Sequence, residues 1–184
     1  MPAKTKTSSL TLGLRLKETM KTEKATFGMG CFWSPQLLFD KTPGVIKTVV
    51  GFMDGNKKRF PNPTYQQVCD NPTGYAEVTQ ITFNPKKISY EKLLDIFWKN
   101  HNPTTKNRQG LDIGVQYRSV IFYHNKKQKE LAEKTKKEQQ KIGSKKKSFF
   151  GGKKVVTEIE PAGKFIKADE HHQKYLEKHG KISC

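Results

Sequence analysis

The sequence predicts an α+β fold whose core is a ferredoxin-like split β-α-β arrangement with additions at its C-terminal end. Apolar segments with strand and helix periodicity follow the order strand, helix, strand, strand, helix, strand, and a further helix, strand and helix complete the chain. The first six of these elements match the split β-α-β pattern. The chain has 184 residues, which is enough for one domain with a substantial core.

Turn signals and helix caps set the boundaries of the predicted elements. Ser89 is placed to cap the second helix, and Asn125 to cap a lysine-dense third helix. Residues 101–116 form a long polar loop, and long loops in compact domains are commonly functional. The predicted strands cover residues 25–27, 45–52, 76–83, 117–124 and 155–159, and the remaining predicted helices begin at residues 34 and 169.

The first 24 residues are rich in Ser, Thr and Lys. We expect residues 1–24 to form a disordered basic tail, which leaves residues 25–184 as a single domain. The alternative is an organelle transit peptide, because the segment is basic and hydroxylated. Glu18, Glu23 and the near absence of arginine argue against that alternative.

Composition limits the class of protein and its compartment. The formal net charge of +18 favours acidic partners such as nucleic acid, an anionic membrane surface or acidic proteins. No apolar run approaches the length of a membrane span, so we expect no membrane association. The cysteines Cys31, Cys69 and Cys184 are widely spaced and odd in number, which fits neither a disulfide framework nor a zinc site. We therefore expect a reducing compartment, the cytoplasm, and one or two working thiols. We also expect the chain to be a monomer.

The chain is organised around residues 28–35, which read Gly-Met-Gly-Cys-Phe-Trp-Ser-Pro between a predicted strand and a predicted helix. Ser34 is a good N-cap and Pro35 suits the first helical turn. This arrangement places Cys31 beside the positive end of a helix dipole, which stabilises the nucleophilic thiolate over the thiol. The alternative is a buried structural cysteine beside two core aromatic residues.

Four polar residues lie where a strand-and-helix core does not need them. Tyr65 falls in a predicted loop, and Glu77 opens a predicted strand. Asp112 and Tyr117 flank the long polar loop. Each of them alone is typical of a solvated or locally hydrogen-bonded side chain. Together with Cys31 they supply a thiolate, carboxyl groups and two phenols, which suit the reduction of a polar, oxygen-bearing substrate.

Six sequence blocks resemble A-type peptide methionine sulfoxide reductases, and they occur in the order found in that family. The resemblance runs from about Thr26 to the C-terminus. It implies that the chain reduces the S epimer of methionine sulfoxide, free or in oxidised proteins. The blocks are Gly30-Cys31-Phe32-Trp33, Asn62-Pro63-Thr64-Tyr65-x-x-Val68-Cys69, Thr73-Gly74-x-Ala76-Glu77-Val78, Pro103-Thr104-Thr105-x-Asn107-Arg108-Gln109-Gly110, Asp112-Ile113-Gly114-x-Gln116-Tyr117-Arg118-Ser119 and His172-Gln173-x-Tyr175-Leu176.

The resemblance also implies a role for each candidate residue. Cys31 attacks the sulfoxide sulfur and becomes a sulfenic acid as methionine leaves. Glu77 protonates the sulfoxide oxygen, because an apolar pocket raises the pKa of a carboxyl group and keeps it protonated. The implied substrate-binding residues are Phe32 and Trp33 for the S-methyl group, and Tyr65 and Tyr117 for the sulfoxide oxygen. Asp112 is implied to bind the substrate and to support these residues.

Cys184 occupies the position where the family often carries its resolving cysteine. Chain ends have reach unless they are tied down, so Cys184 is expected to form a disulfide with Cys31. A thioredoxin-like reductant would return that disulfide to two thiols by exchange. The alternative is a terminal thiol with no role. We expect Cys69 to be structural, and the resemblance calls for no metal or organic cofactor.

Ten lysines between residues 125 and 147 make the third helix strongly basic. The simplest interpretation is a solvated helix face. The rival is a nucleic-acid-binding module that uses this face for phosphates. Arginine and aromatic residues for base contacts are missing among these lysines, so we do not expect nucleic-acid binding. A second rival is a thiol peroxidase or redox switch that also uses Cys31.

Overall fold

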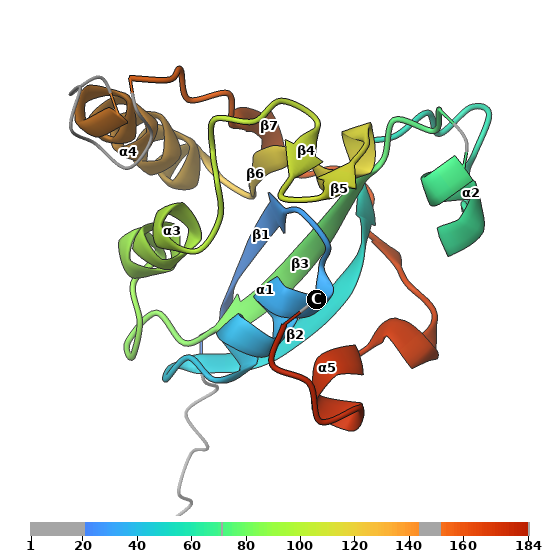
Figure 1. The fold of residues 1–184 in the computed structure, drawn as a ribbon. Helices are drawn as coiled ribbons and strands as arrows, with labels where there is room; N and C mark the ends of the chain where they lie inside the picture. Colours follow the sequence, from blue (N-terminus) through green and yellow to red (C-terminus); the bar gives the residue numbers. More distant parts are fainter. Residues whose placement is uncertain (1–20, 71, 144–151, 184) are drawn as a thin grey trace, which may run out of the picture.

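The computed structural model describes residues 21–70, 72–143 and 152–183 and has a mixed α+β fold with one central sheet (Figure 1). The predicted α+β class is confirmed. Most of the expected N-terminal tail lies outside the described residues. The first strand, β1 (Glu23–Met29), begins inside the expected tail, because Glu23 and Lys24 pair with residues of a neighbouring strand. None of the described helices is long and apolar enough to cross a membrane.

The sheet has six strands, and β1 lies in its middle. The order across the sheet is β7 (Glu158–Pro161), β6 (Ser119–Tyr123), β1, β3 (Ala76–Phe83), β2 (Val45–Met53) and β8 (Ile166–Lys167). Neighbouring strands of the sheet run antiparallel, with one exception. The edge strand β7 runs parallel to its neighbour β6.

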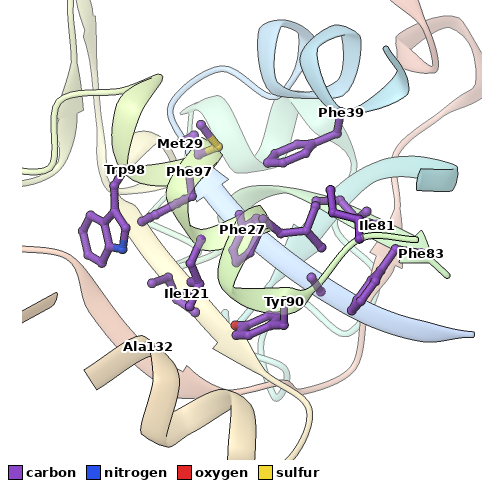
Figure 2. Packing of buried hydrophobic residues seen from close by; sticks show 14 of the residues in the cluster. Phe27, Met29, Phe39, Ile81, Phe83, Tyr90, Phe97, Trp98, Ile121 and Ala132 are labelled. Atoms are coloured by element: carbon purple, nitrogen blue, oxygen red, sulfur yellow. The ribbon is translucent and has the colours of Figure 1, made fainter. Parts of the chain in front are cut away.

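Three helices pack against the sheet through an aromatic core, shown in Figure 2. Phe27 of β1 contacts Phe39 of α1 (Trp33–Asp40), with ring centroids 5.8 Å apart, and Phe97 of α3 (Tyr90–Lys99), with centroids 5.1 Å apart. Ala132 joins the same cluster from α4 (Lys126–Gly143). Burying one such ring contributes about 1.5–3 kcal/mol, so this core fixes the position of β1 and of the turn that follows it.

The predicted caps of α3 and α4 are confirmed. Ser89 Oγ accepts a hydrogen bond from the Lys92 backbone N–H at 3.1 Å, and Asn125 Oδ1 accepts one from Gln128 at 2.9 Å. On α4 the buried residues are Gln128, Ala132 and Gly143, so most of its lysines face solvent. Its surface ion pairs include Lys126–Glu130 and Lys129–Glu133, each one helical turn apart.

The predicted cap of α1 is wrong. The helix begins at Trp33 with Phe32 as N-cap and without a side-chain cap bond, so Ser34 lies inside its first turn. The predicted loop around Tyr65 is also wrong, because α2 (Tyr65–Asp70) is a short helix. A reciprocal capping box explains it: Thr64 Oγ1 accepts from the Gln67 N–H at 3.2 Å, and Thr64 N–H donates to Gln67 Oε1 at 3.0 Å.

The long polar loop contains regular structure. A two-stranded ribbon of β4 (Arg108–Gln109) and β5 (Asp112–Ile113) precedes a 3-10 turn at Val115–Tyr117, so β6 begins at Ser119 and not at Tyr117. The strand predicted at 155–159 also starts later, at Glu158. The preceding backbone bonds to other groups instead, since Val156 N–H donates to Pro103 O at 2.8 Å.

The predicted final helix over 169–178 is broken into two pieces. A 3-10 turn covers Glu170–His172 and α5 covers Tyr175–Lys178, with Lys174 between them at φ +55°. Long-range bonds compete with helical geometry at the break. The Lys174 N–H donates to Gln36 Oε1 of α1 at 2.7 Å, so the backbone turns toward α1.

Candidate active site

Cys31 lies in the tight turn between β1 and α1, and the turn depends on Gly30. Gly30 has φ +91°, and a Cβ there would lie 2.6 Å from the Gln109 Cβ. Glycine is therefore required both for the backbone conformation and for the close approach of the β4–β5 ribbon. Cys31 is half-buried, directly before the N-cap of α1, where the helix dipole favours a negative charge.

Glu77 is attached to the same turn by a backbone hydrogen bond. The Phe32 N–H, one residue after Cys31, donates to Glu77 Oε2 at 3.0 Å. Glu77 is 1% exposed and comes from β3, which pairs directly with β1. The buried carboxyl group thus holds Phe32, the N-cap residue of α1, and does not cap the N–H groups of the first helical turn. It is 45 residues away in the sequence, so local cap rules cannot find it.

Tyr65 and Tyr117 converge on this region, and Cys69 lies with them. Cys69 interacts electrostatically with both phenols. Burial, followed by the nearby Glu77 carboxyl group, raises the pKa of Tyr65 and of Tyr117 well above the usual range for a phenol. Both hydroxyls are therefore protonated donors at neutral pH.

Cys69 lies close to Tyr65 and Tyr117, and its structural role stays a prediction. Its spacing from Tyr65, four residues along α2, puts both side chains on one helix face and could have indicated this proximity. Burial raises the pKa of the Cys69 thiol, so it remains protonated at neutral pH. Cys31 and Cys69 are both outside disulfides.

Asp112 lies at the edge of this group, on the β4–β5 ribbon. It is partly exposed and interacts electrostatically with Tyr117. Its partner across the ribbon is Gln109, which packs against Gly30. The structure therefore places Asp112 beside Gln109, on the face of the ribbon that is turned toward the site.

Phe32 and Trp33 belong to a cluster of aromatic rings beside the Cys31 turn. Phe32 is buried and contacts Tyr65 and Phe52, with ring centroids 6.2 and 5.9 Å apart. Trp33 is partly exposed and stacks on Tyr175 of α5, with centroids 4.0 Å apart and an interplanar angle of 14°. These rings give the site an apolar wall built from α1, α2, β2 and the C-terminal segment.

His172 is a component of this wall to which the sequence gave no role. It is 4% exposed, and its ring lies 4.2 Å from that of Tyr65 and 5.9 Å from that of Trp33, between centroids. Burial lowers the pKa of His172, so the imidazole is neutral at neutral pH. Within the described part of the chain, neither of its ring nitrogens has a hydrogen-bond partner.

The C-terminal segment is anchored behind the aromatic wall by Gln173. Its side-chain amide exchanges two hydrogen bonds with the backbone of Val50, at 3.0 and 2.9 Å, and donates to Ala168 O at 2.9 Å. Cys184 lies outside the described residues. Its proposed pairing with Cys31 therefore stays a prediction.

The assembled groups suit thiol chemistry on an oxygen-bearing substrate. A half-buried thiol, a buried carboxyl group bonded to the next residue and two protonated phenols surround one turn beside an aromatic wall. Across residues 21–70, 72–143 and 152–183, no cluster of three or more histidine, cysteine or acidic side chains could hold a metal ion.

Comparisons with known proteins agree on one family. The sequence profile described as "Peptide methionine sulfoxide reductase" matches residues 23–184. The chain is 48% identical over 162 residues to the peptide methionine sulfoxide reductase MsrA of Methanothermobacter thermautotrophicus, covering 88% of this chain and 90% of that protein.

Two solved structures of the yeast protein Mxr1 show the same fold. The reduced form from Saccharomyces cerevisiae superimposes with a TM-score of 0.79 at 35% identity, covering 89% of this chain and 88% of Mxr1. Mxr1 in complex with Trx2 superimposes with a TM-score of 0.56 at 26% identity, covering 86% of this chain and 87% of that one.

Proposed function

We propose that this chain, which belongs to the peptide methionine sulfoxide reductase family, reduces the S epimer of methionine sulfoxide in proteins and as the free amino acid. One observation carries the proposal. The carboxyl group of Glu77 and the thiol of Cys31 are joined through a single peptide unit, because the Phe32 N–H donates to Glu77 Oε2 at 3.0 Å. A nucleophile and a proton donor are thus held in one fixed relation.

In the proposed first step, the Cys31 thiolate attacks the sulfur of the sulfoxide. This attack forms a bond between the two sulfur atoms, and a proton passes from Glu77 to the sulfoxide oxygen. As the resulting hydroxyl group moves to the Cys31 sulfur, the sulfur–sulfur bond and the methionine sulfur–oxygen bond both break. Methionine leaves, and Cys31 becomes a sulfenic acid. The substrate sulfur gains two electrons, and the Cys31 sulfur loses them. The conversion of thiolate and sulfoxide to sulfenic acid and methionine consumes one proton.

The remaining site residues orient the substrate. Tyr65 and Tyr117 are protonated and converge, which supports a role as hydrogen-bond donors to the sulfoxide oxygen. Trp33 and Phe32 offer an apolar surface for the S-methyl group. Asp112 lies on the β4–β5 ribbon and is proposed to hold the substrate backbone or Tyr117.

Cys184 is proposed to resolve the sulfenic acid. Its thiol attacks the Cys31 sulfur, water leaves and a disulfide forms; a thioredoxin-like dithiol then reduces the disulfide by exchange. The yeast protein Mxr1, which is similar to this chain, has been captured in complex with Trx2, and this supports the proposed reductant. Cys184 follows the end of α5 by six residues, since α5 ends at Lys178 and the chain has 184 residues.

The fold type, the bounds of the domain, the compartment and the oligomeric state are also proposals. The strand order β6-β1-β3-β2, with α1 after β1 and α3 after β3, supports a ferredoxin-like split β-α-β core. We propose one reductase domain that includes residues 25–184. We further propose that it acts as a cytoplasmic monomer in the repair of oxidised proteins.

The test is reduction of each sulfoxide epimer of N-acetylmethionine, with dithiothreitol and then with thioredoxin. We expect turnover of the S epimer alone, and its loss in Cys31→Ser. Cys184→Ser should keep turnover with dithiothreitol and lose turnover with thioredoxin. Glu160→Gln, at an exposed position in β7, serves as the control, because it should retain turnover with both reductants. Reduction of peroxide without reduction of either epimer would contradict the proposal and support a thiol peroxidase.

A further inference from the structure

The β4–β5 ribbon exposes two large aliphatic side chains beside the candidate active site. Leu111, in the turn of the ribbon, is 92% exposed, and Ile113, in β5, is 70% exposed. They flank Asp112 directly in the sequence. Burying an aliphatic side chain of this size is worth about 1.5–3 kcal/mol, and the folded chain leaves this free energy unused at both positions.

The ribbon has an inner and an outer face. Gln109 faces the Gly30 turn, since a Cβ on Gly30 would lie 2.6 Å from its Cβ. Asp112 is the register partner of Gln109 and therefore shares the inner face. Side chains alternate along a strand, so Ile113 belongs to the outer face. The ribbon is thus a wall of the site, with its polar side inward and its aliphatic side outward.

The exposed aliphatic residues elsewhere do not share this position. Ile142 is 50% exposed near the end of α4, and Ile46 is 47% exposed in β2. Ile142 lies on a helix that neither contacts the Cys31 turn nor carries a candidate site residue, and Ile46 lies at the opposite end of β2 from Phe52, which contacts Phe32. Ile182 is 87% exposed and lies beyond α5, in the segment that leads to Cys184. The β4–β5 ribbon both contacts the Cys31 turn and carries a candidate site residue, through Gln109 and Asp112.

We propose that Leu111 and Ile113 form a docking surface for aliphatic side chains that neighbour methionine sulfoxide in a polypeptide substrate. This inference rests on the proposed function. When the sulfoxide of a polypeptide reaches Cys31, the rest of the polypeptide must pass over the walls of the site. The ribbon packed on Gly30 is one of these walls. The free amino acid ends within the site and has no side chain that could reach the outer face. The surface therefore selects among protein-bound substrates and leaves the reaction itself unchanged.

The experiment compares three substrates: N-acetylmethionine sulfoxide, and two blocked pentapeptides with either leucine or glycine on both sides of methionine sulfoxide. For the unmodified chain we expect kcat/KM for the leucine peptide to exceed that for the glycine peptide by about fivefold to tenfold, as partial burial of two aliphatic groups would give. In the double variant Leu111→Asn/Ile113→Thr this preference should fall below about twofold. The matched control Ile142→Thr should keep it.

The outcomes separate the inference from the function. Equal kcat/KM for the two peptides with the unmodified chain would overturn the inference, and so would a preference that survives the double variant. A double variant that changes only the KM for thioredoxin would assign the surface to the reductant and overturn it too. Turnover of N-acetylmethionine sulfoxide shows whether the variant is folded. Its absence with the unmodified chain would instead refute the proposed function.

Discussion

The turn that carries Cys31 and the segment that leads to Cys184 are held in different ways. The Cys31 turn is fixed on two sides, by Gln109 against Gly30 and by the Phe32 N–H on Glu77. The C-terminal segment is held as far as α5, where Gln173 bonds to Val50, Lys174 bonds to Gln36 and Tyr175 stacks on Trp33. Beyond α5, residues 179–183 are exposed, and the backbone bonds of residues 179–181 run back to the same segment.

This difference matches the two proposed roles. A nucleophile gains from a fixed geometry, because a misplacement of about 1 Å can cost about a hundredfold in rate. A resolving thiol gains from reach, because it must arrive only after the sulfenic acid has formed. The following variants test the contrast, from the largest expected effect to the smallest.

The largest effect is expected for Glu77→Gln. The amide can still accept the Phe32 N–H bond, so the turn keeps its shape, but it cannot supply an acidic proton. We expect kcat/KM for the S epimer, measured with dithiothreitol, to fall by about 10²–10⁴-fold with little change in melting temperature. Glu160→Gln, at an exposed position in β7, is the control and should be unaffected. A fall of less than fivefold would remove Glu77 from the role of proton donor.

Gly30→Ala and Gly180→Ala compare the two regions directly. Both glycines have positive φ, +91° and +62°, but a Cβ meets Gln109 at the first and nothing within 4 Å at the second. We expect Gly30→Ala to lose about 2–4 kcal/mol of unfolding free energy and most of its activity. Gly180→Ala should lose about 1 kcal/mol and little activity. Equal losses in chemical denaturation would mean that the ribbon does not constrain the turn.

Gln173→Ala should release the C-terminal segment from Val50. The loss of three buried hydrogen bonds is expected to cost about 2 kcal/mol of unfolding free energy. Because the proposed resolving step depends on where the segment leads Cys184, turnover with thioredoxin should fall more than turnover with dithiothreitol. Gln66→Ala, on the exposed side of α2, is the control. An equal fall with both reductants would show that the segment also shapes the substrate site.

The smallest effect concerns pH and His172. Burial lowers the pKa of His172 in the folded chain, so below about pH 6.5 the unfolded chain binds a proton that the folded chain does not. This group therefore stabilises the fold less as the pH falls through that value. We expect the melting temperature to drop less between pH 7 and pH 5.5 in His172→Phe than in the unmodified chain. The same drop in both would contradict the burial of a neutral imidazole.

The sequence predicted the parts of the fold and of the site that local motifs encode. The glycine turn with Cys31, the strand that carries Glu77 and the caps of α3 and α4 all depend on neighbouring residues, and the structure has them at the predicted places. The α+β class followed from the same alternation of periodicities.

The features that failed depend on contacts between distant residues. Ser34 does not cap α1, because the helix already begins at Trp33, and the bond that holds its N-cap residue Phe32 comes from Glu77, 45 residues away. The final helix is broken where Lys174 bonds to Gln36, 138 residues away. Cys69 comes close to Tyr117, 48 residues away, only in the folded chain. The local patterns of a single sequence do not predict such long-range contacts.

The stack of Trp33 on Tyr175 gives the molecule a built-in optical probe. The chain has two tryptophans, and Trp98 is buried in the core with its Nε1–H donating to Thr135 Oγ1 at 3.0 Å. Trp33 instead joins the two regions compared above, since its ring centroid lies 4.0 Å from that of Tyr175. Any departure of the C-terminal segment separates these rings and exposes the indole to water. In a chain with Trp98→Phe, the fluorescence of Trp33 would therefore follow the movement of that segment in real time, without any added label.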